Sequence, residues 1–185
     1  MIRIIAGEYR GLKLKVPTGQ DVRPTSDRVR EALFNLLTPL LNWEKMTVLD
    51  LYAGSGALGL EALSRGALKA VFVESSRKQM KIIRQNIELL SLKQTKFELV
   101  QDRAGKWITL FADPQNPALV FLDPPFSSNE YKLLLEKLSL LPTIRSGSLI
   151  TVESTQTREI LFPNNLELIK HRRYGSITLD ILRKG

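Results

Sequence analysis

Apolar residues occur in short runs along the chain, and segments with helical periodicity lie between most of these runs. Short apolar runs are typical of buried parallel strands, and we expect five at residues 47–51, 70–73, 97–100, 118–122 and 147–152. Apolar stripes with helical spacing predict helices over residues 26–37, 57–64, 76–90 and 129–141. Strands that alternate with helices in this way indicate an α/β class with an open, mostly parallel sheet.

Two further pairs of apolar or alternating runs lie toward the ends of the chain. Residues 2–6 and 12–16 flank a loop with two glycines, which predicts a β-hairpin. Residues 166–170 and 177–182 form a second pair, and a closing antiparallel hairpin departs from a nicotinamide-binding Rossmann domain. At 185 residues the chain suits a single domain. We expect a hairpin extension at residues 1–22 and a core at residues 23–185.

The turn after the strand at 47–51 contains only small residues and leads directly into a helix, so it lies where α/β sheets bind ligands. Gly54 and Gly56 lack a Cβ, which lets backbone approach a ligand closely. The spacing from Gly54 to Gly59 also matches the dinucleotide fingerprint. Asp50, however, would repel a pyrophosphate at that loop. A ligand with a cationic or amine-bearing end suits this strand end better.

Acidic residues also follow two other expected strands. Glu74 ends the strand at 70–73, where a carboxylate can accept hydrogen bonds from both ribose hydroxyls of a nucleoside. The strand at 118–122 ends in Asp123-Pro124-Pro125-Phe126. The two prolines withhold backbone donors and leave their carbonyls as acceptors, so the turn is suited to bind an amine. Phe126 is placed to stack on a planar base.

Composition narrows the classes of function. The chain has no cysteine and one histidine, which excludes disulfides and cysteine nucleophiles and argues against a zinc site or a Ser-His-Asp triad. No apolar run reaches the roughly 18 residues of a membrane span, and no signal peptide opens the chain. We therefore expect a cytoplasmic protein with no membrane and no metal. The net charge of +8 favours a polyanionic partner such as nucleic acid, although solubility alone accounts for it about as well.

Basic residues surround Tyr9 on the predicted N-terminal hairpin, a pattern suited to a phosphate backbone. Lysines on a hairpin edge also protect it from aggregation. Because this hairpin lies far along the chain from the glycine turn, we expect its charges to serve a nucleic acid rather than the packing of that turn. Arg28 and Arg30 oppose the macrodipole of the helix at 26–37, which indicates an anionic ligand nearby. The expected nucleic-acid contacts are Arg3, Arg10, Lys13 and Lys15, with Arg172 and Arg173 as a second basic surface.

These motifs together resemble class I S-adenosylmethionine-dependent methyltransferases that modify amines, and more closely the RsmD-type 16S ribosomal RNA (guanine-N2) methyltransferases. The glycine turn points only to the superfamily, the Asp-Pro-Pro-Phe turn narrows it to amine targets, and two N-terminal stretches indicate the RsmD type. The resemblance covers nearly the whole chain, through Arg3-Ile4-Ile5-Ala6-Gly7 with Arg10-Gly11, Arg23-Pro24-Thr25 to Phe34, Asp50-Leu51-Tyr52-Ala53-Gly54-Ser55-Gly56, and Asp123 to Phe126.

The resemblance implies a Rossmann-like sheet of seven strands, mostly parallel with the last strand antiparallel, and helices on both faces. It implies a monomer that binds S-adenosyl-L-methionine and acts on 16S ribosomal RNA of the small ribosomal subunit. Glu74 would hold the ribose and Asp102 the adenine amine, while residues 23–34 would close over the cofactor and orient the substrate. The implied cofactor contacts are Asp50, Tyr52, Ala53, Gly54, Gly56, Glu74, Asp102, Thr25 and Arg28, and Arg23 joins the substrate contacts.

In such a site the Asp123 carboxylate and the Pro124 carbonyl would accept hydrogen bonds from the guanine amine and direct its lone pair at the methyl group. Pro125 stiffens the turn, and Phe126 would stack on the extruded base. The lack of cysteine excludes carbon-5 methylation of pyrimidines through a thiol adduct. Two alternatives stay open. One is methylation of DNA adenine-N6 or cytosine-N4, and the other is a catalytically silent RNA-binding module on this fold.

Overall fold

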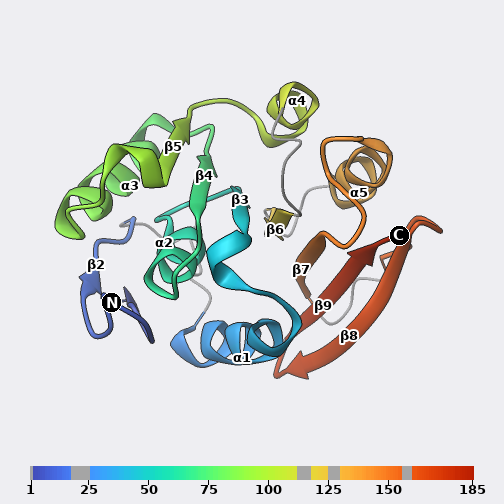
Figure 1. Cartoon of the computed structure of the whole chain (residues 1–185), viewed down its shortest axis with the longest axis horizontal. Helices are drawn as coiled ribbons and strands as arrows, with labels where there is room; N and C mark the ends of the chain where they lie inside the picture. Colours follow the sequence, from blue (N-terminus) through green and yellow to red (C-terminus); the bar gives the residue numbers. More distant parts are fainter. Residues whose placement is uncertain (1, 18–25, 112–117, 125–129, 156–159) are drawn as a thin grey trace.

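The structure, a computed structural model, describes residues 2–17, 26–111, 118–124, 130–155 and 160–185. Its main element is a seven-stranded sheet with the order β5-β4-β3-β6-β7-β9-β8 (Figure 1). The five strands β3 to β7 are parallel, while β9 runs antiparallel to both β7 and β8. This confirms the predicted sheet and its antiparallel last strand. The strands are β3 (Thr47–Leu51), β4 (Lys69–Val73), β5 (Phe97–Val100), β6 (Ala118–Leu122), β7 (Leu149–Thr155), β8 (Leu166–Tyr174) and β9 (Ile177–Lys184).

Helices cover both faces of the sheet, as Figure 1 shows. Strand residues alternate between two cores, because successive side chains of a strand point to opposite faces. Phe72 and Phe121 pack with α1 to α3, whereas Val71 and Val120 pack with α4 and α5. The α-helices are α1 (Asp27–Leu37), α2 (Ala57–Ser64), α3 (Arg77–Leu89), α4 (Ala104–Trp107) and α5 (Glu130–Leu140), and the 3₁₀ helices are η1 (Thr38–Leu40), η2 (Trp43–Lys45), η3 (Gln94–Lys96) and η4 (Ile108–Leu110).

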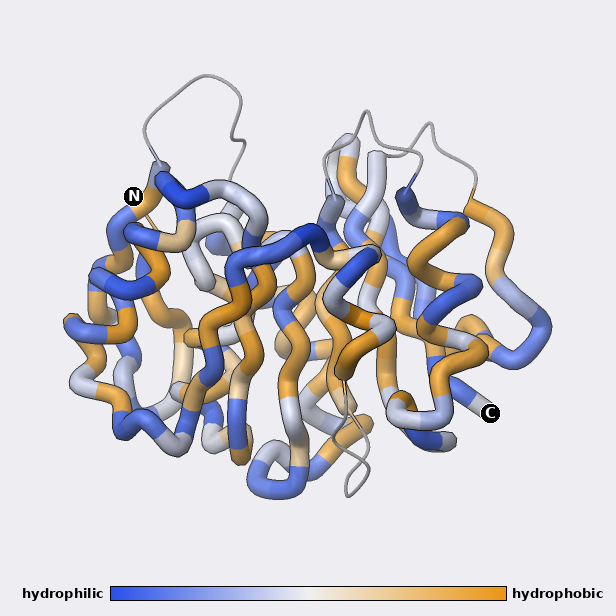
Figure 2. The backbone as a smooth tube through the Cα atoms, turned by 90° about the horizontal axis from the view of Figure 1, so that it is seen from above, coloured by the Kyte–Doolittle hydropathy of each residue, from blue (hydrophilic) through white to orange (hydrophobic). Residues whose placement is uncertain are grey.

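Most expected elements lie within a few residues of their predicted positions. Ser26 caps α1, because its Oγ accepts a hydrogen bond from the Val29 N–H at 3.3 Å. The helix α4 was not predicted, since four residues are too few to show a helical period. The strands β7 to β9 are longer than expected. Figure 2 shows apolar stretches along the central strands, and hydrophilic residues at turns and interspersed with apolar ones along the outer helices.

The N-terminal hairpin consists of β1 (Ile2–Arg3) and β2 (Lys13–Leu14), which pair antiparallel. Its strands are shorter than predicted because the next backbone donors, Ile5 and Ala6, point to Glu61 of α2 at 2.7 and 3.1 Å. The hairpin therefore packs against the helix that follows the glycine turn. These contacts are made by backbone N–H groups, so the expectation that the basic side chains of the hairpin serve nucleic acid rather than packing stays a prediction.

The structure leaves the predicted boundary between residues 22 and 23 untested, since it falls outside the described residues. None of the described helices is both long and apolar enough to cross a membrane. All of the described strands except β1 and β2 belong to the single large sheet. The carboxyl ends of its parallel strands meet at one edge, and most of the predicted site residues lie there.

Candidate active site

Four acidic residues lie at the carboxyl ends of four neighbouring strands. Asp50 lies on β3, Glu74 directly follows β4, Asp123 directly follows β6 and Glu153 lies on β7. Each lies two or four positions along the chain from a strand residue that packs in the core under α1 to α3, namely Val48, Phe72, Phe121 and Leu149. All four acids therefore point to that face of the sheet. The structure thus brings together three predicted acids and a fourth, Glu153, that was not predicted.

Asp50 is hydrogen-bonded to the first turn of α2, directly after the glycine turn. It is 2 % exposed, and its Oδ2 accepts a hydrogen bond from the Gly59 N–H at 2.9 Å. Burial, opposed by this bond and aided by the charge of Glu74, raises the pKa of Asp50 to about 7. Gly56 caps α2 with φ of 77°, a left-handed conformation that favours glycine. Asp50 therefore fixes the start of α2 beneath the loop.

Glu74 is hydrogen-bonded to the backbone of the glycine turn. Its Oε2 accepts a hydrogen bond from the Gly54 N–H at 3.0 Å, and its Oε1 accepts one from the Ser76 N–H at 2.8 Å. Each carboxylate oxygen has a second lone pair, so Glu74 remains able to accept hydrogen bonds from hydroxyl groups. The predicted ribose contact is compatible with this arrangement and stays a prediction.

Tyr52 and Ala53 extend the strand end toward the loop. Both N–H groups donate to the Val73 carbonyl at 3.1 Å, and Tyr52 has a positive φ of 67°, which costs backbone strain. The Tyr52 hydroxyl donates to the Glu130 carboxylate at the start of α5. Burial and then this carboxylate raise the pKa of Tyr52. The contact ties the glycine loop to the helix that follows the Asp-Pro-Pro-Phe turn.

Asp123 and Pro124 form the second half of the site. Burial raises the pKa of Asp123 well above its ordinary value, and the charges of Glu153 and Asp50 raise it further. The Tyr131 hydroxyl donates to the Glu153 carbonyl at 2.9 Å and lies 3.4 Å from the Pro124 carbonyl. Pro125 and Phe126 lie outside the described residues. The described part of the turn presents a carboxylate and a carbonyl, both of which accept hydrogen bonds.

Asp102 lies two residues beyond β5 and is partly exposed. It accepts hydrogen bonds from the Arg103 N–H at 2.8 Å and from the Lys106 Nζ at 2.9 Å. The bond from Lys106, followed by that from Arg103, lowers the pKa of Asp102, so it is a carboxylate at neutral pH. Its predicted contact with an adenine amine stays a prediction.

The basic residues at the start of α1 differ from the expectation in one respect. Arg28 is exposed and stays a predicted ligand contact, while Thr25 and Arg23 lie outside the described residues. Arg30 is 1 % exposed and donates to the Asp27 carboxylate at 3.0 Å and to the Arg3 carbonyl. Arg30 therefore links α1 to β1, and its interpretation as a sign of an anionic ligand is wrong.

The predicted RNA contacts are exposed but lie in different places. Tyr9 in the hairpin loop donates through its N–H to Ser64 Oγ at 3.0 Å, so the neighbouring Arg10 lies near the end of α2, away from the acids. Arg172 pairs with Leu179, which pairs in turn with Glu153. The end of β8 thus lies level with the acidic strand ends. The exposed predicted contacts within the described residues are Arg3, Arg10, Lys13, Lys15, Arg172 and Arg173.

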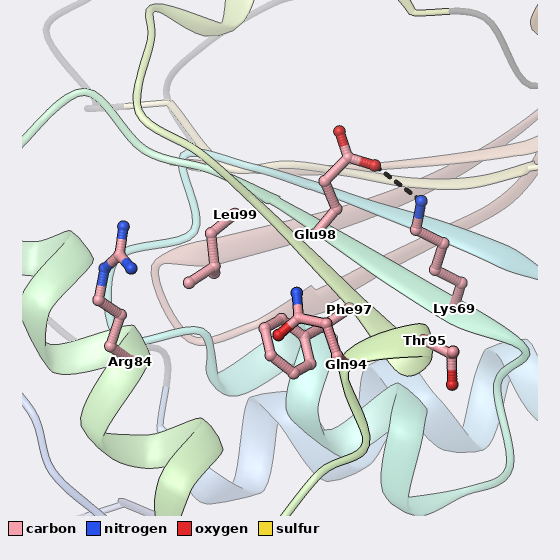
Figure 3. Close-up of a pocket in the computed structure, with 7 residues that line it drawn as sticks. All are labelled: Lys69, Arg84, Gln94, Thr95, Phe97, Glu98 and Leu99. Atoms are coloured by element: carbon pink, nitrogen blue, oxygen red, sulfur yellow. Dashed lines mark hydrogen bonds and ion pairs between the residues drawn. The ribbon is translucent and has the colours of Figure 1, made fainter.

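A separate pocket of about 560 Å³ lies at the edge strand β5 (Figure 3). Lys69 and Phe97 begin β4 and β5, so this pocket lies toward the amino ends of the strands. An ion pair of 2.7 Å joins Lys69 to Glu98 at its rim. Because the acids lie at the carboxyl ends, this pocket is not part of the candidate site.

Comparisons with known proteins identify the family. The family described as "Conserved hypothetical protein 95" matches residues 2–183. Ribosomal RNA small subunit methyltransferase D of Escherichia coli is 38 % identical over 99 % of this chain and 90 % of its own length. The chain belongs to the RsmD-type family of class I methyltransferases. A second relative with the same name, from Haemophilus influenzae, is 35 % identical over 96 % of this chain and 91 % of its own length.

A solved structure agrees with this assignment. The Escherichia coli protein yhhF has a TM-score of 0.82 at 35 % identity and covers 99 % of this chain, which covers 97 % of it. Membership of the RsmD-type family confirms the resemblance stated above and, with it, S-adenosylmethionine as the cofactor. Glu153 was missed although it directly follows the expected strand at 147–152, the same pattern that drew attention to Glu74 and Asp123.

Proposed function

We propose that this chain transfers the methyl group of S-adenosylmethionine to the exocyclic N2 amine of a guanine in 16S ribosomal RNA. The observation that supports this most strongly is the pair of acceptors, the Asp123 carboxylate and the Pro124 carbonyl, at the carboxyl end of β6. An acceptor pair of this kind suits an amine. The relatives named ribosomal RNA small subunit methyltransferase D supply the RNA class. A cytoplasmic monomer is the simplest state for this activity and is part of the proposal.

The acidic side chains at the strand ends fit a cationic cofactor. The charges of Glu153 and Asp50 add to burial in raising the pKa of Asp123, and a nearby positive charge relieves such repulsion. Glu74 would hold the ribose, and the loop at Gly54 and Gly56 would receive the amino acid end. When bound, S-adenosylmethionine supplies a methyl group that its sulfonium already activates for displacement.

The residues of the turn would then prepare the amine. The guanine N2 lone pair is delocalised into the ring, and hydrogen bonds to Asp123 and to the Pro124 carbonyl favour a pyramidal nitrogen whose lone pair faces the methyl group. The Asp123 carboxylate stabilises the positive charge that develops on nitrogen. Its raised pKa also makes it suited to accept the proton that this nitrogen loses.

The decisive experiment uses small ribosomal subunits from an Escherichia coli strain that lacks its own methyltransferase D. The purified protein is incubated with these subunits and labelled S-adenosylmethionine, and the RNA is digested and mapped by mass spectrometry. We expect one N2-methylguanosine. Transfer to adenine-N6 or cytosine-N4 of DNA instead would favour the alternative enzyme. Cofactor binding without transfer to any nucleic acid would favour the silent RNA-binding module.

The proposal makes a prediction for Glu74. Glu74→Ala should weaken S-adenosylmethionine binding by roughly 1.5–3 kcal/mol, because hydrogen bonds to a charged group are lost and the Gly54 N–H loses its partner. Isothermal titration measures this. Glu98→Ala, which removes an exposed acid on β5, is the matched control and should leave binding unchanged. An unaltered dissociation constant for Glu74→Ala would remove Glu74 from the cofactor site.

The two predicted basic surfaces, one on β8 and one on the N-terminal hairpin, should contribute differently to RNA binding. Arg172→Ala with Arg173→Ala should raise the Michaelis constant for RNA and lower the slope of log affinity against log salt by roughly one to two units, one for each lost phosphate contact. The pair Arg10→Ala with Lys13→Ala should have a smaller effect, since Arg10 lies near the far end of α2. Filter binding at several salt concentrations measures both slopes. If both double variants keep the wild-type slope, neither surface contacts RNA. A larger effect of the hairpin pair would show that the hairpin contributes more to RNA binding than Arg172 and Arg173.

A further inference from the structure

We propose that Glu153 selects guanine among the bases by accepting a hydrogen bond from its ring N1–H, beside the amine that Asp123 holds. This inference rests on the proposed function, since it concerns the same site. It adds a specificity determinant that the Asp-Pro-Pro-Phe turn cannot supply, because that turn suits the exocyclic amine of any base.

The register of the sheet places Glu153 beside Asp123. β6 and β7 pair in parallel with Leu122 opposite Val152, so the two acids that follow are neighbours on adjacent strands. Adjacent strands lie about 4.8 Å apart. Both side chains point to the same face, and the charge of Glu153 is the largest electrostatic cause of the raised pKa of Asp123. Two acceptors therefore lie next to each other at one edge of the site.

The backbone around Glu153 is fixed by the same contacts that hold the turn. Glu153 is 6 % exposed, and its carbonyl accepts a hydrogen bond from the Tyr131 hydroxyl, which also lies close to the Pro124 carbonyl. Tyr131 is itself buried in α5. Tyr131 thus links the backbone at Glu153 to the backbone at Pro124, and so joins the two strand ends that carry the acids.

Only guanine matches two adjacent acceptors. Its Watson–Crick edge presents the N2 amine next to an N1–H, which are two donors side by side. Adenine presents its N6 amine next to an N1 lone pair, and cytosine presents its N4 amine next to an N3 lone pair. A carboxylate beside Asp123 would repel either lone pair. A site built to bind a substrate N–H rejects analogues that lack it. Glu153 therefore favours guanine over the bases of the alternative enzyme.

The experiment compares guanine with 2-aminopurine, which keeps the 2-amino group but has an N1 lone pair in place of the N1–H. Each base is placed at the methylated position of small-subunit RNA by ligation, and the RNA is assembled with ribosomal proteins. The wild-type protein should methylate guanine at least about 100-fold faster, because a site that binds a substrate N–H rejects an analogue that lacks it. Equal rates on the two bases would overturn the inference whatever the variants do.

Glu153→Gln tests the residue itself. The glutamine amide can donate to an N1 lone pair, so the preference for guanine should fall at least about 10-fold, with slower transfer to guanine. Glu153→Asp, which retains the carboxylate, should keep the preference. Glu98→Gln is the control for loss of an acid elsewhere. An unchanged preference in Glu153→Gln would overturn the inference alone, whereas no transfer to guanine-N2 by the wild-type protein would overturn the proposed function.

Discussion

Asp123→Ala is expected to abolish methyl transfer while leaving the affinity for S-adenosylmethionine within about tenfold, or roughly 1.4 kcal/mol. The asymmetry follows from position, because Asp123 follows β6 and would face the amine in the proposed function, whereas Glu74 and the glycine loop follow β4 and β3. Losing one group that stabilises developing charge in a buried site lowers kcat by about 10²–10³-fold. The loss of the acceptor that orients the lone pair adds to this.

A tritium-transfer assay beside isothermal titration measures the two effects separately. Asp123→Asn is the matched variant, since it keeps the size and one acceptor but removes the charge. Burial and neighbouring charges raise the pKa of Asp123, so the carboxylate forms as pH rises, and wild-type kcat should rise over that range. Asp123→Asn should lose this rise. Near-normal turnover by the alanine variant would remove Asp123 from the chemistry.

The strand ends of this fold were largely predictable from the sequence. Asp50, Glu74 and Asp123 each stand at the end of an apolar run, and parallel strands bring such positions to one edge. The same reasoning applies to Glu153, but no glycine turn or proline pair beside it drew attention to that position. The position of Glu153 beside Asp123 could be found only from the strand order, because the sequence alone does not show that β7 lies next to β6.

The hairpin and α1 were less predictable because their contacts join distant parts of the chain. Lys15 donates through its N–H to Asn86 of α3 at 2.8 Å, and Asn86 donates in turn to the Ser55 carbonyl in the glycine turn at 2.9 Å. Arg30 was expected to indicate an anionic ligand nearby, yet it is buried against Asp27 and the Arg3 carbonyl. A buried arginine with such partners follows no periodic pattern, so only the structure reveals it.

Glu61→Ala should destabilise the protein by about 3–5 kcal/mol, which is the cost of breaking a buried, charged contact. Glu61 is fully buried, and its carboxylate accepts hydrogen bonds from the Ile5 and Ala6 N–H groups and from Arg65 Nε at 2.8 Å. Alanine would leave these donors without that partner. The hairpin backbone also packs closely on α2, because a Cβ added at Gly7 would lie 1.8 Å from the Ser64 carbonyl oxygen. The hairpin therefore has little room to shift and give these donors new partners.

Urea unfolding measures the loss, with hydrogen exchange at the Ile5 and Ala6 amides as a local readout. Glu98→Ala is the matched control, because its ion pair with Lys69 is solvent-accessible and such pairs contribute about 0–1 kcal/mol. Glu61→Gln keeps one oxygen acceptor and should fall between the two. A loss below about 1 kcal/mol for Glu61→Ala would show that the hairpin is held by its apolar contacts, Ile2, Ile4 and Leu14, rather than by Glu61. The expected loss would show that Glu61 joins the basic hairpin to α2, the helix that follows the glycine turn.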